Sequence, residues 1–598
     1  MREKPWQPEK ICVAGTCAVF DFDFSERTFT SLREKGFDAI VFGYLDANWD
    51  GEFSRIDMYS ESEVLPEVIP HARVEKNRAE LKRRLELAEK AGLSVYMSVR
   101  GPMTYTDLET LNPDAAKRYE TLFGTGGDKW GGSGMRPFCL SETKVRKHYL
   151  RMFEDVETRF PQIKGFMFFG GDSYCLVCDD QCPKCAGKSE YLRWGEWIDE
   201  LHADAQKRNS IARFDIMNWP WWDDMFDMID HIDTDIGVVA VTNWGFSFGD
   251  RTDGKYPAIT EPYELGEFQW DCLHVQKTDH GTAKALTQGW FNAPISDSFK
   301  KLTQKCKAQG RRIIGWTELV CSEAVWPYFL PSPATTIERL SELRELDVDG
   351  VFDLWGIAAD MIYDRHIDAN LSAFQTFFRE NAEDMEQVLL KTANQLYGNK
   401  GSEWAVKAWK ALDDALASWG IIAYCQRMHW TLRRFFVDDA CSFYVLDLTL
   451  NLEKDPHLHF IPMWPEFLLK PETWDRLKAN LTHVIEGYDK ALSCYDRLMN
   501  ELDGNALETA QFHEDSLLLG RTYQQMGLEA CVYHAASLRK EKLDRDFMRS
   551  AVLTRRMCRL LYTKLGTVPV EHRIDLLLAK MVEYANGSEP IQGAEFPN

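Results

Sequence analysis

The chain has 598 residues, with 70 Lys and Arg against 93 Asp and Glu, which gives a formal net charge of -23 at pH 7. Binding to nucleic-acid phosphates, or to an anionic membrane surface, needs clustered cations, so this charge argues against both partners. A chain of this length exceeds what one hydrophobic core supports, and we expect two or more domains.

The expected compartment follows from the N-terminus and the cysteines. The stretch Met1-Arg-Glu-Lys-Pro-Trp6 lacks the apolar core of a signal peptide, and no apolar run is long enough to span a bilayer. Of the 15 cysteines, four are grouped and the others are scattered, as is typical of reduced thiols. We therefore expect a cytoplasmic protein, although a chain whose signal peptide had been removed would have the same features.

Residues 1–368 alternate short apolar runs with amphipathic stretches such as Ala79–Ala91 and Val145–Phe160. The predicted strands are Ile11–Phe20, Ala39–Tyr44, Ser94–Arg100, Gly165–Phe169, Arg213–Asn218, Gly237–Thr242, Arg312–Trp316 and Gly350–Leu354. Eight strands in series, separated by helices, predict an α/β fold: a (β/α)8 TIM barrel over residues 1–368. No Gly-x-Gly-x-x-Gly turn follows the first strand, so we expect neither a dinucleotide-binding fold nor an organic cofactor.

Four cysteines follow the fourth predicted strand, which ends in Phe168-Phe-Gly-Gly-Asp172 and delivers a carboxylate at its C-terminal tip. The cysteines come next, as Cys175, Cys178, Cys182 and Cys185. Two Cys-x2-Cys pairs can complete a four-thiolate zinc site, which is structural because it has no open coordination position. An iron–sulfur cluster is the alternative metal site, and free thiols or disulfides are the alternatives without metal. We expect the metal loop, residues 175–185, to orient Asp172 and Tyr174.

Long helical patterns replace the strand pattern from about residue 369. The clearest are Leu371–Leu396, Trp404–Ala417, Trp474–Asn500, Ala506–Lys540 and Arg545–Leu565. They predict an all-α C-terminal domain over residues 369–598, with a structural role or a role in forming a homodimer.

The C-terminal ends of the barrel strands are where catalytic and binding groups lie in this fold. At these positions the sequence carries carboxylates, amides and tryptophans and hardly any histidine, so a catalytic zinc site is not favoured. Tryptophan stacks on the apolar face of a sugar ring, and amides and carboxylates bind its hydroxyls. The predicted substrate-binding residues are Asp46, Arg100, Tyr174, Asn218, Trp219, Trp222, Asn243, Trp244, Trp316, Asp353 and Trp355.

Cleavage of a glycosidic bond needs two carboxyl groups, one to protonate the leaving oxygen and one to act as nucleophile or base. Asp172 after the fourth strand and Glu318 after the seventh are the predicted catalytic pair. These strands lie across the barrel mouth from each other, which suits two groups that flank one bond. The alternative is that either residue is a buried structural acid, with Asp46 and Asp353 as the next candidates.

The run Phe168-Phe-Gly-Gly-Asp172 resembles the strand-four motif of family 20 β-N-acetylhexosaminidases, in which Gly-Gly-Asp is followed by Glu. The preceding Arg136-Pro-Phe-Cys-Leu-Ser141 is also similar to that family, and Trp316 stands in the place of its strand-seven Trp. The resemblance implies a barrel glycosidase in which Asp172 orients the acetamido group that attacks the anomeric carbon. Ser173 replaces the family's catalytic Glu, so the substrate-assisted reaction is not carried over. Barrel α-glucuronidases with helical C-terminal domains are a second resemblance.

Three functions compete at this point. The first is an exo-acting glycoside hydrolase that removes a terminal sugar from an oligosaccharide or glycoside. The second is a hexosaminidase-derived glycan-binding protein, which Ser173 favours. The third is a sugar lyase or isomerase on a barrel, which would need a Lys, His or Tyr base or a divalent ion at the strand ends.

Overall fold

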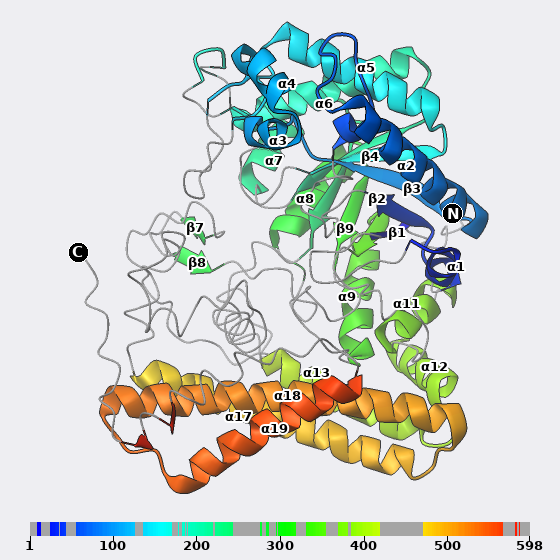
Figure 1. Ribbon diagram of the computed structural model, residues 1–598. Helices are drawn as coiled ribbons and strands as arrows, with labels where there is room; N and C mark the ends of the chain where they lie inside the picture. The colour runs from blue at the N-terminus through cyan, green and yellow to red at the C-terminus, as the bar shows by residue number, and fades with distance from the viewer. Residues whose placement is uncertain are drawn as a thin grey trace. The chain divides into compact units, whose positions relative to one another are not determined.

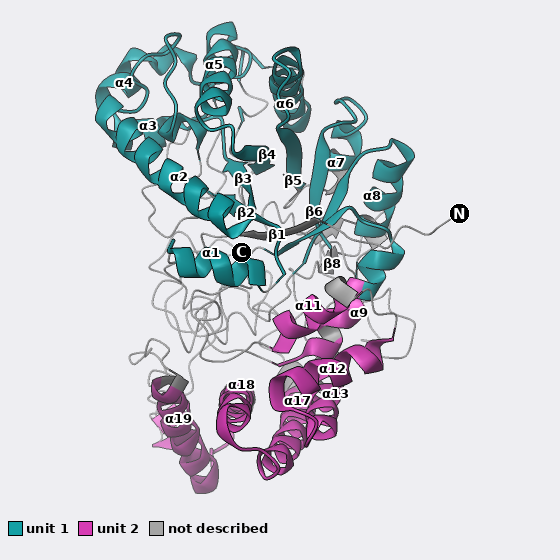
Figure 2. Cartoon of the chain, turned by 90° about the vertical axis from the view of Figure 1, so that its right-hand side faces the viewer, with its two compact units in different colours: residues 1–245, 295–318, 341–364 teal, residues 246–294, 319–340, 365–598 magenta. Residues whose placement is uncertain are grey.

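A computed structural model describes residues 9–13, 24–34, 36–42, 55–125, 136–169, 177–178, 182–185, 187, 189–218, 222–242, 275–277, 283–285, 295, 297–317, 331–353, 369–380, 384–418, 471–565, 581–582 and 585–586. The chain divides into two compact units (Figure 2). Unit 1 comprises residues 1–245, 295–318 and 341–364, and unit 2 comprises residues 246–294, 319–340 and 365–598. The predicted division after residue 368 stays a prediction.

Eight parallel strands of unit 1 pair side by side into a closed ring. They are β1 (Glu9–Val13), β2 (Ala39–Phe42), β3 (Ser94–Val99), β4 (Ile163–Phe169), β5 (Arg213–Asn218), β6 (Gly237–Val241), β9 (Ile313–Trp316) and β10 (Gly350–Asp353). Figure 1 labels β1, β2, β3, β4 and β9 among them. The order around the ring is β1-β10-β9-β6-β5-β4-β3-β2. Each of the eight predicted strands overlaps one of these, because strands buried in a parallel sheet are apolar on both faces and therefore conspicuous in sequence.

Helices join all consecutive strands of this ring. They are α1 (Glu26–Glu34), α2 (His71–Ala91), α3 (Tyr105–Leu111), α4 (Pro113–Arg118), α5 (Thr143–Arg159), α6 (Glu190–Lys207), α7 (Trp222–Met228), α8 (Asp297–Ala308) and α9 (Pro333–Glu345). The α/β class and the parallel sheet are therefore confirmed. The helix expected directly after β10 falls on residues that the structure does not describe, so the complete (β/α)8 repeat stays a prediction.

Contacts with the helices show which face of a strand points into the barrel. On β4, Phe166 and Phe168 lie 4.9 and 5.7 Å from the Phe153 ring of α5, measured between ring centroids, and so face the helices. Because successive side chains of a strand alternate, Met167 and Phe169 face the barrel interior. All of these side chains are buried, which explains why β4 is apolar along most of its length.

Unit 2 contains a small antiparallel pair, β7 (Val275–Lys277) and β8 (Ala283–Ala285), and long helices. The helices are α11 (Ala369–Glu380), α12 (Met385–Tyr397), α13 (Ser402–Ser418), α17 (Pro471–Met499), α18 (Gly504–Arg539) and α19 (Arg545–Leu565). The predicted helical C-terminal region is confirmed. None of the helices described has both the length and the apolar character needed to cross a bilayer.

The helical pattern predicted over Leu371–Leu396 corresponds to two helices, α11 and α12. The Asp384 carboxylate accepts a hydrogen bond from the backbone N–H of Glu386 at 2.9 Å and so caps the start of α12. An aspartate in this position satisfies a backbone donor that the first turn of a helix leaves unpaired.

Candidate functional site: strand ends and a four-cysteine cluster

Most of the predicted site lies outside the described residues. This holds for Asp46, Asp172, Tyr174, Cys175, Trp219, Asn243, Trp244, Glu318 and Trp355. The strands that lead to the predicted catalytic pair are described: β4 ends at Phe169, three positions before Asp172, and β9 ends at Trp316, two positions before Glu318. The pair itself stays a prediction.

Trp316 lies at the C-terminal end of β9 and faces the barrel interior. A Cβ atom on the preceding Gly315 would come within 2.9 Å of Leu343 in α9, so Gly315 faces the helices and Trp316 the opposite side. The Trp316 ring lies 5.4 Å from that of Phe352 on β10 and is 1% exposed. The Trp316 and Phe352 rings therefore pack against each other inside the barrel near the strand ends.

Asp353 is the last residue of β10 and is buried. It follows Phe352, which pairs in register with Trp316, so alternation turns Asp353 toward the helices and away from the interior. This placement does not favour direct contact with a substrate held in the barrel mouth, and its binding role stays a prediction.

Three further predicted binding residues are placed by the backbone. Arg100 directly follows the last residue of β3 and is half-buried. Asn218 is the last residue of β5, and Trp222 is the first residue of α7, which follows that strand. All three therefore lie at C-terminal strand ends or in the segment that follows, as expected, and their contacts with a substrate stay predictions.

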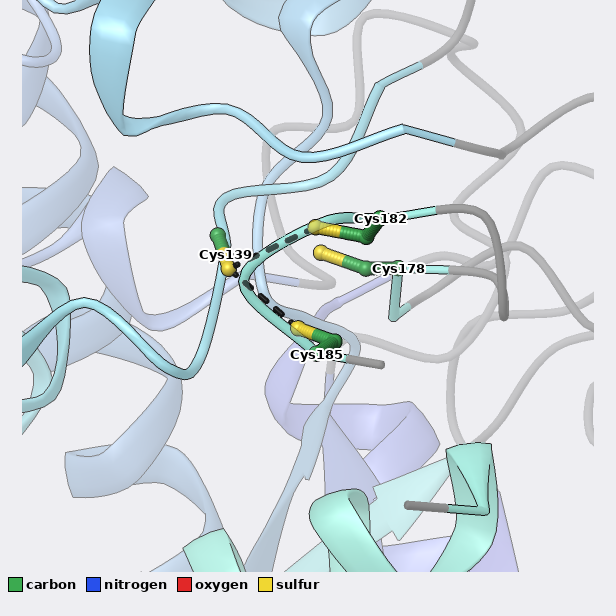
Figure 3. Close-up of side chains that lie close together, drawn as sticks. All are labelled: Cys139, Cys178, Cys182 and Cys185. Carbon is green, nitrogen blue, oxygen red and sulfur yellow. Dashed lines mark hydrogen bonds between the residues drawn. The ribbon is translucent and has the colours of Figure 1, made fainter. Parts of the chain in front are cut away.

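Four buried cysteines from the connections that follow β3 and β4 meet in one cluster (Figure 3): Cys139, Cys178, Cys182 and Cys185. Their sulfur atoms all lie within 4.8 Å of one another. The Cys139 Sγ lies 3.4 Å from that of Cys185 and 3.9 Å from that of Cys182. As Figure 3 shows, Cys139 approaches from one segment and the other three from another, with the sulfur atoms pointing inward.

The segment that carries Cys139 belongs to the connection between β3 and α5. Phe138 forms a β-bridge with Phe123, and the Cys139 backbone N–H donates to the Leu122 carbonyl at 2.8 Å. Gly124 makes room for the cluster, because a Cβ atom at this position would lie 2.0 Å from the Cys178 Sγ. A side chain here would therefore displace the thiol.

The segment that carries the other three cysteines belongs to the connection between β4 and α6. The Cys185 backbone N–H donates to the Cys182 carbonyl at 2.9 Å, which closes a tight turn around the Cys-x2-Cys pair. Arg193 of α6, which is 4% exposed, donates to the Cys185 carbonyl at 3.0 Å and also to the Cys178 carbonyl. The Ser141 hydroxyl lies 3.2 Å from the Cys185 Sγ.

The thiols perturb one another electrostatically. A hydrogen bond with the Cys178 thiol lowers the pKa of Cys139 to about 5, and the same interaction, with burial, raises the pKa of Cys178. Burial also raises the pKa of Cys185. One thiolate is thus favoured and further ionisation is opposed, because negative charges on converging sulfur atoms repel one another.

The cluster could hold a metal ion, and its composition differs from the set expected from sequence. Cys178, Cys182 and Cys185 are members as predicted, Cys175 lies outside the described residues, and Cys139 was missed. The only sequence signal was the position of Cys139 in the segment that precedes the fourth strand. Its separation from the other cysteines hides it from any argument based on local spacing.

A buried acid, Asp57, was also missed. It lies in a 3-10 helix, η1 (Ile56–Met58), within the connection between β2 and α2. Burial raises its pKa from 3.8 to about 6, although the neighbouring Arg55 opposes the shift. Arg55 is itself paired with Asp107 at 2.9 Å. The sequence offered no sign that this carboxyl group would be buried.

Comparison with known proteins gives a fold relationship. No protein-family model and no curated protein sequence matches the chain. Among solved structures, a GH138 enzyme targeting pectin rhamnogalacturonan II is similar, with a TM-score of 0.52 and 11% identity. The match covers 94% of this chain and 62% of the enzyme's chain, so this chain spans less than two thirds of that protein.

Two further structures align more weakly. A GH115 4-O-methyl-α-glucuronidase has a TM-score of 0.39 at 10% identity, over 99% of this chain and 63% of its own. A family 89 glycoside hydrolase from Clostridium perfringens has a TM-score of 0.36 at 11% identity, over 99% and 64%. The GH138 structure, at 11% identity and a TM-score of 0.52, shows a glycoside hydrolase-like fold. The closer resemblance to family 20 stays a prediction.

Proposed function

We propose that the chain is a glycoside hydrolase with its active site at the C-terminal ends of the barrel strands. The observation that carries this proposal is the order of the strands around the ring, in which β4 and β9 are separated by β5 and β6. Asp172 and Glu318 follow β4 and β9 within three residues. Parallel strands direct all their C-terminal ends to one mouth, so the two acids approach a common substrate from different sides.

The chemistry follows from the two carboxyl groups. One protonates the glycosidic oxygen while the other acts as nucleophile or as base toward water. Trp316 supports this site from within the barrel, since its ring faces the interior just below the strand ends. The fold shared with a glycoside hydrolase agrees with the proposal at the level of class.

The proposed substrate is an oligosaccharide or glycoside from which a terminal sugar is removed. Ser173 stands where family 20 enzymes carry their acid, so Glu318 is the proposed proton donor or nucleophile partner of Asp172. The same serine favours the second candidate, a glycan-binding protein that has lost turnover.

An activity screen tests the proposal. The purified protein is assayed against aryl α- and β-hexosides, hexosaminides and uronides, and the substrate that responds is used to compare variants. Asp172→Asn and Glu318→Gln should each lower kcat by at least about 100-fold with unchanged circular dichroism, because each removes a proton donor, base or nucleophile. Asp114→Asn and Glu86→Gln, on the exposed surface, are the controls and should keep full activity. Full activity of both site variants would contradict the assignment.

We also propose that the cysteine loop after β4 holds a structural zinc ion. Four thiolates around zinc leave no position for water, so the ion stabilises the loop and does not take part in the reaction. Cys178, Cys182 and Cys185 supply three of the ligands.

A further inference from the structure

We infer that Cys139 is the fourth ligand of this zinc site, so that the ion cross-links the connection after β3 to the connection after β4. The inference rests on the proposed zinc site and replaces Cys175, which the spacing of the cysteines had suggested. Its physical basis is the distance between sulfur atoms, the room left around them and the charges nearby.

The distances suit a single tetrahedral ion. A zinc–sulfur bond of about 2.3 Å places the corners of a tetrahedron about 3.8 Å apart. Cys139 lies 3.4 and 3.9 Å from two of the other sulfur atoms, and all four lie within 4.8 Å of one another. A disulfide needs about 2.05 Å, and an iron–sulfur cluster divides its four thiolates among two or more irons, so that thiolates on different irons stand farther apart. One ion at the centre therefore fits best.

The surroundings suit a negatively charged centre. Four thiolates and one zinc ion carry a net charge of -2, which is costly to bury without nearby cations or hydrogen-bond donors. Arg193 provides a buried cation and holds the Cys178 and Cys185 carbonyls. Lys184, next to Cys185, pairs with Glu142 at 2.6 Å, and its ammonium donates to the Thr121 carbonyl at 2.6 Å. The Ser141 hydroxyl can donate to the Cys185 thiolate.

The order of the strands also explains how Cys139 reaches the cluster although it is distant from the other three cysteines in the sequence. β3 and β4 are neighbours in the ring, so the connections that follow them emerge side by side. The β-bridge between Phe123 and Phe138 fixes the backbone before Cys139, and Gly124 leaves space for the Cys178 sulfur. The ion would thus fasten two neighbouring loops at the end of the barrel that carries the proposed active site.

Metal analysis of two matched variants tests the inference. Zinc and iron are measured by mass spectrometry in the full-length protein, in Cys139→Ser and in Cys175→Ser. We expect about one zinc ion per chain in the wild type and in Cys175→Ser, and less than about half of that in Cys139→Ser. Loss of zinc from Cys175→Ser together with retention in Cys139→Ser would overturn the role of Cys139 but keep the zinc site. Absence of zinc from the wild type, or iron in its place, would overturn the zinc proposal itself.

The metal analysis depends on correct folding of Cys139→Ser. A second measurement therefore uses the wild-type protein alone. The native protein is treated with N-ethylmaleimide before and after chelation, and the modified cysteines are mapped in peptides. We expect Cys139, Cys178, Cys182 and Cys185 to become reactive only after chelation, while the reactivity of Cys175 does not depend on it. Cys306, a buried thiol outside the cluster, is the control and should stay unmodified throughout. If chelation releases Cys175 and leaves Cys139 unmodified like Cys306, the inference is wrong.

Discussion

A group of buried polar side chains in the helical unit is joined by strong hydrogen bonds, whereas the clustered buried thiols of the barrel unit contact one another only weakly. In unit 2 the Tyr495 hydroxyl accepts from the Trp409 indole at 3.1 Å and lies 3.1 Å from the Tyr397 hydroxyl, which in turn lies 2.5 Å from His513 Nδ1. Hydroxyl, indole and imidazole groups are strong donors and acceptors, and here they bond to one another within the protein. Thiols are weak donors and weaker acceptors, so the cysteine cluster gains little from its own contacts.

The helical unit pairs its buried charges as well. Glu529 of α18 and Arg555 of α19 are each 2% exposed and form an ion pair, and the Thr554 hydroxyl donates to Glu529 at 2.7 Å. A buried network of paired charges and strong hydrogen bonds is typical of a structural role. A buried cluster of thiols, which bond weakly to one another and are metal ligands by chemistry, is typical of a metal site. The predictions below test this difference between the two units.

Removal of metal is expected to cause the largest loss of stability. This loss should be confined to unit 1. Dialysis of the protein against a strong chelator should destabilise the connections around the cysteine cluster by about 5 kcal/mol or more, because folding of these loops is coupled to zinc binding. Hydrogen exchange measured by mass spectrometry should show loss of protection in residues 136–142 and 182–193. Residues 481–530 of the helical unit should keep their protection. Equal loss in both units would contradict the contrast.

Breaking the buried ion pair should have the next largest effect. Arg555→Met leaves the Glu529 carboxylate buried without its cation, and the free energy of unfolding should fall by about 3–5 kcal/mol. Chemical denaturation followed by circular dichroism measures the change. Arg556→Met, an exposed neighbour on the same helix, is the matched control and should change stability by less than about 0.5 kcal/mol. Comparable losses in the two variants would show that the pair has no special role.

Asp57 offers a pH-dependent test in the barrel unit. Its pKa is about 6 in the folded chain and 3.8 without burial, so the folded state holds the extra proton between these values. The protonated Asp57 carboxyl is tolerated in the folded state, so the protein keeps this part of its free energy of unfolding at pH 4. It loses that part as the pH rises through 6 and the buried carboxyl ionises. Asp57→Asn should therefore be more stable than the wild type at pH 7.5, by up to about 3 kcal/mol, and nearly equal to it at pH 4. Denaturation at both pH values measures this gain.

The exposed Asp114→Asn variant is the control for that experiment, because it changes the same charge without burial. A gain for Asp57→Asn that is the same at both pH values, or that Asp114→Asn reproduces, would show that burial of the Asp57 charge is not its cause.

The hydroxyl network should give the smallest effect. Tyr495→Phe removes the acceptor of the Trp409 indole and one partner of Tyr397, and it should cost about 1–2 kcal/mol. In a double-mutant cycle, Tyr397→Phe and Tyr495→Phe together should cost less than the sum of the two single changes, because both remove the same hydrogen bond. Strict additivity would mean that this bond contributes nothing to stability.

The strands of the barrel were largely predictable from sequence because buried parallel strands are short continuous apolar runs. β5 begins and ends at the predicted residues, and β4 begins only two residues before its prediction. The break between α11 and α12 is hard to predict because an apolar period continues across it, and the one local start signal is Asp384, which caps α12. The hydrogen bond made by Asp384 thus sets the start of α12, although the apolar period of the sequence does not stop there.

The site was less predictable than the fold. Three of the clustered cysteines share one short segment and could be grouped by spacing, but Cys139 joins them only because β3 and β4 are neighbours in the ring. Gly124 and Arg193 belong to the site for the same reason, since neither is near the cysteines in a motif. Asp353 shows the converse: its place at a strand end was predictable, but the direction of its side chain followed from the register with β9.

The measurement that tests the central claim most directly is zinc X-ray absorption on the purified Cys175→Ser variant. The account predicts four sulfur ligands at about 2.3 Å, because Cys139, Cys178, Cys182 and Cys185 are all retained. Three sulfur ligands with one oxygen or nitrogen at about 2.0–2.2 Å would contradict it, since they would show that Cys175 had supplied the fourth thiolate.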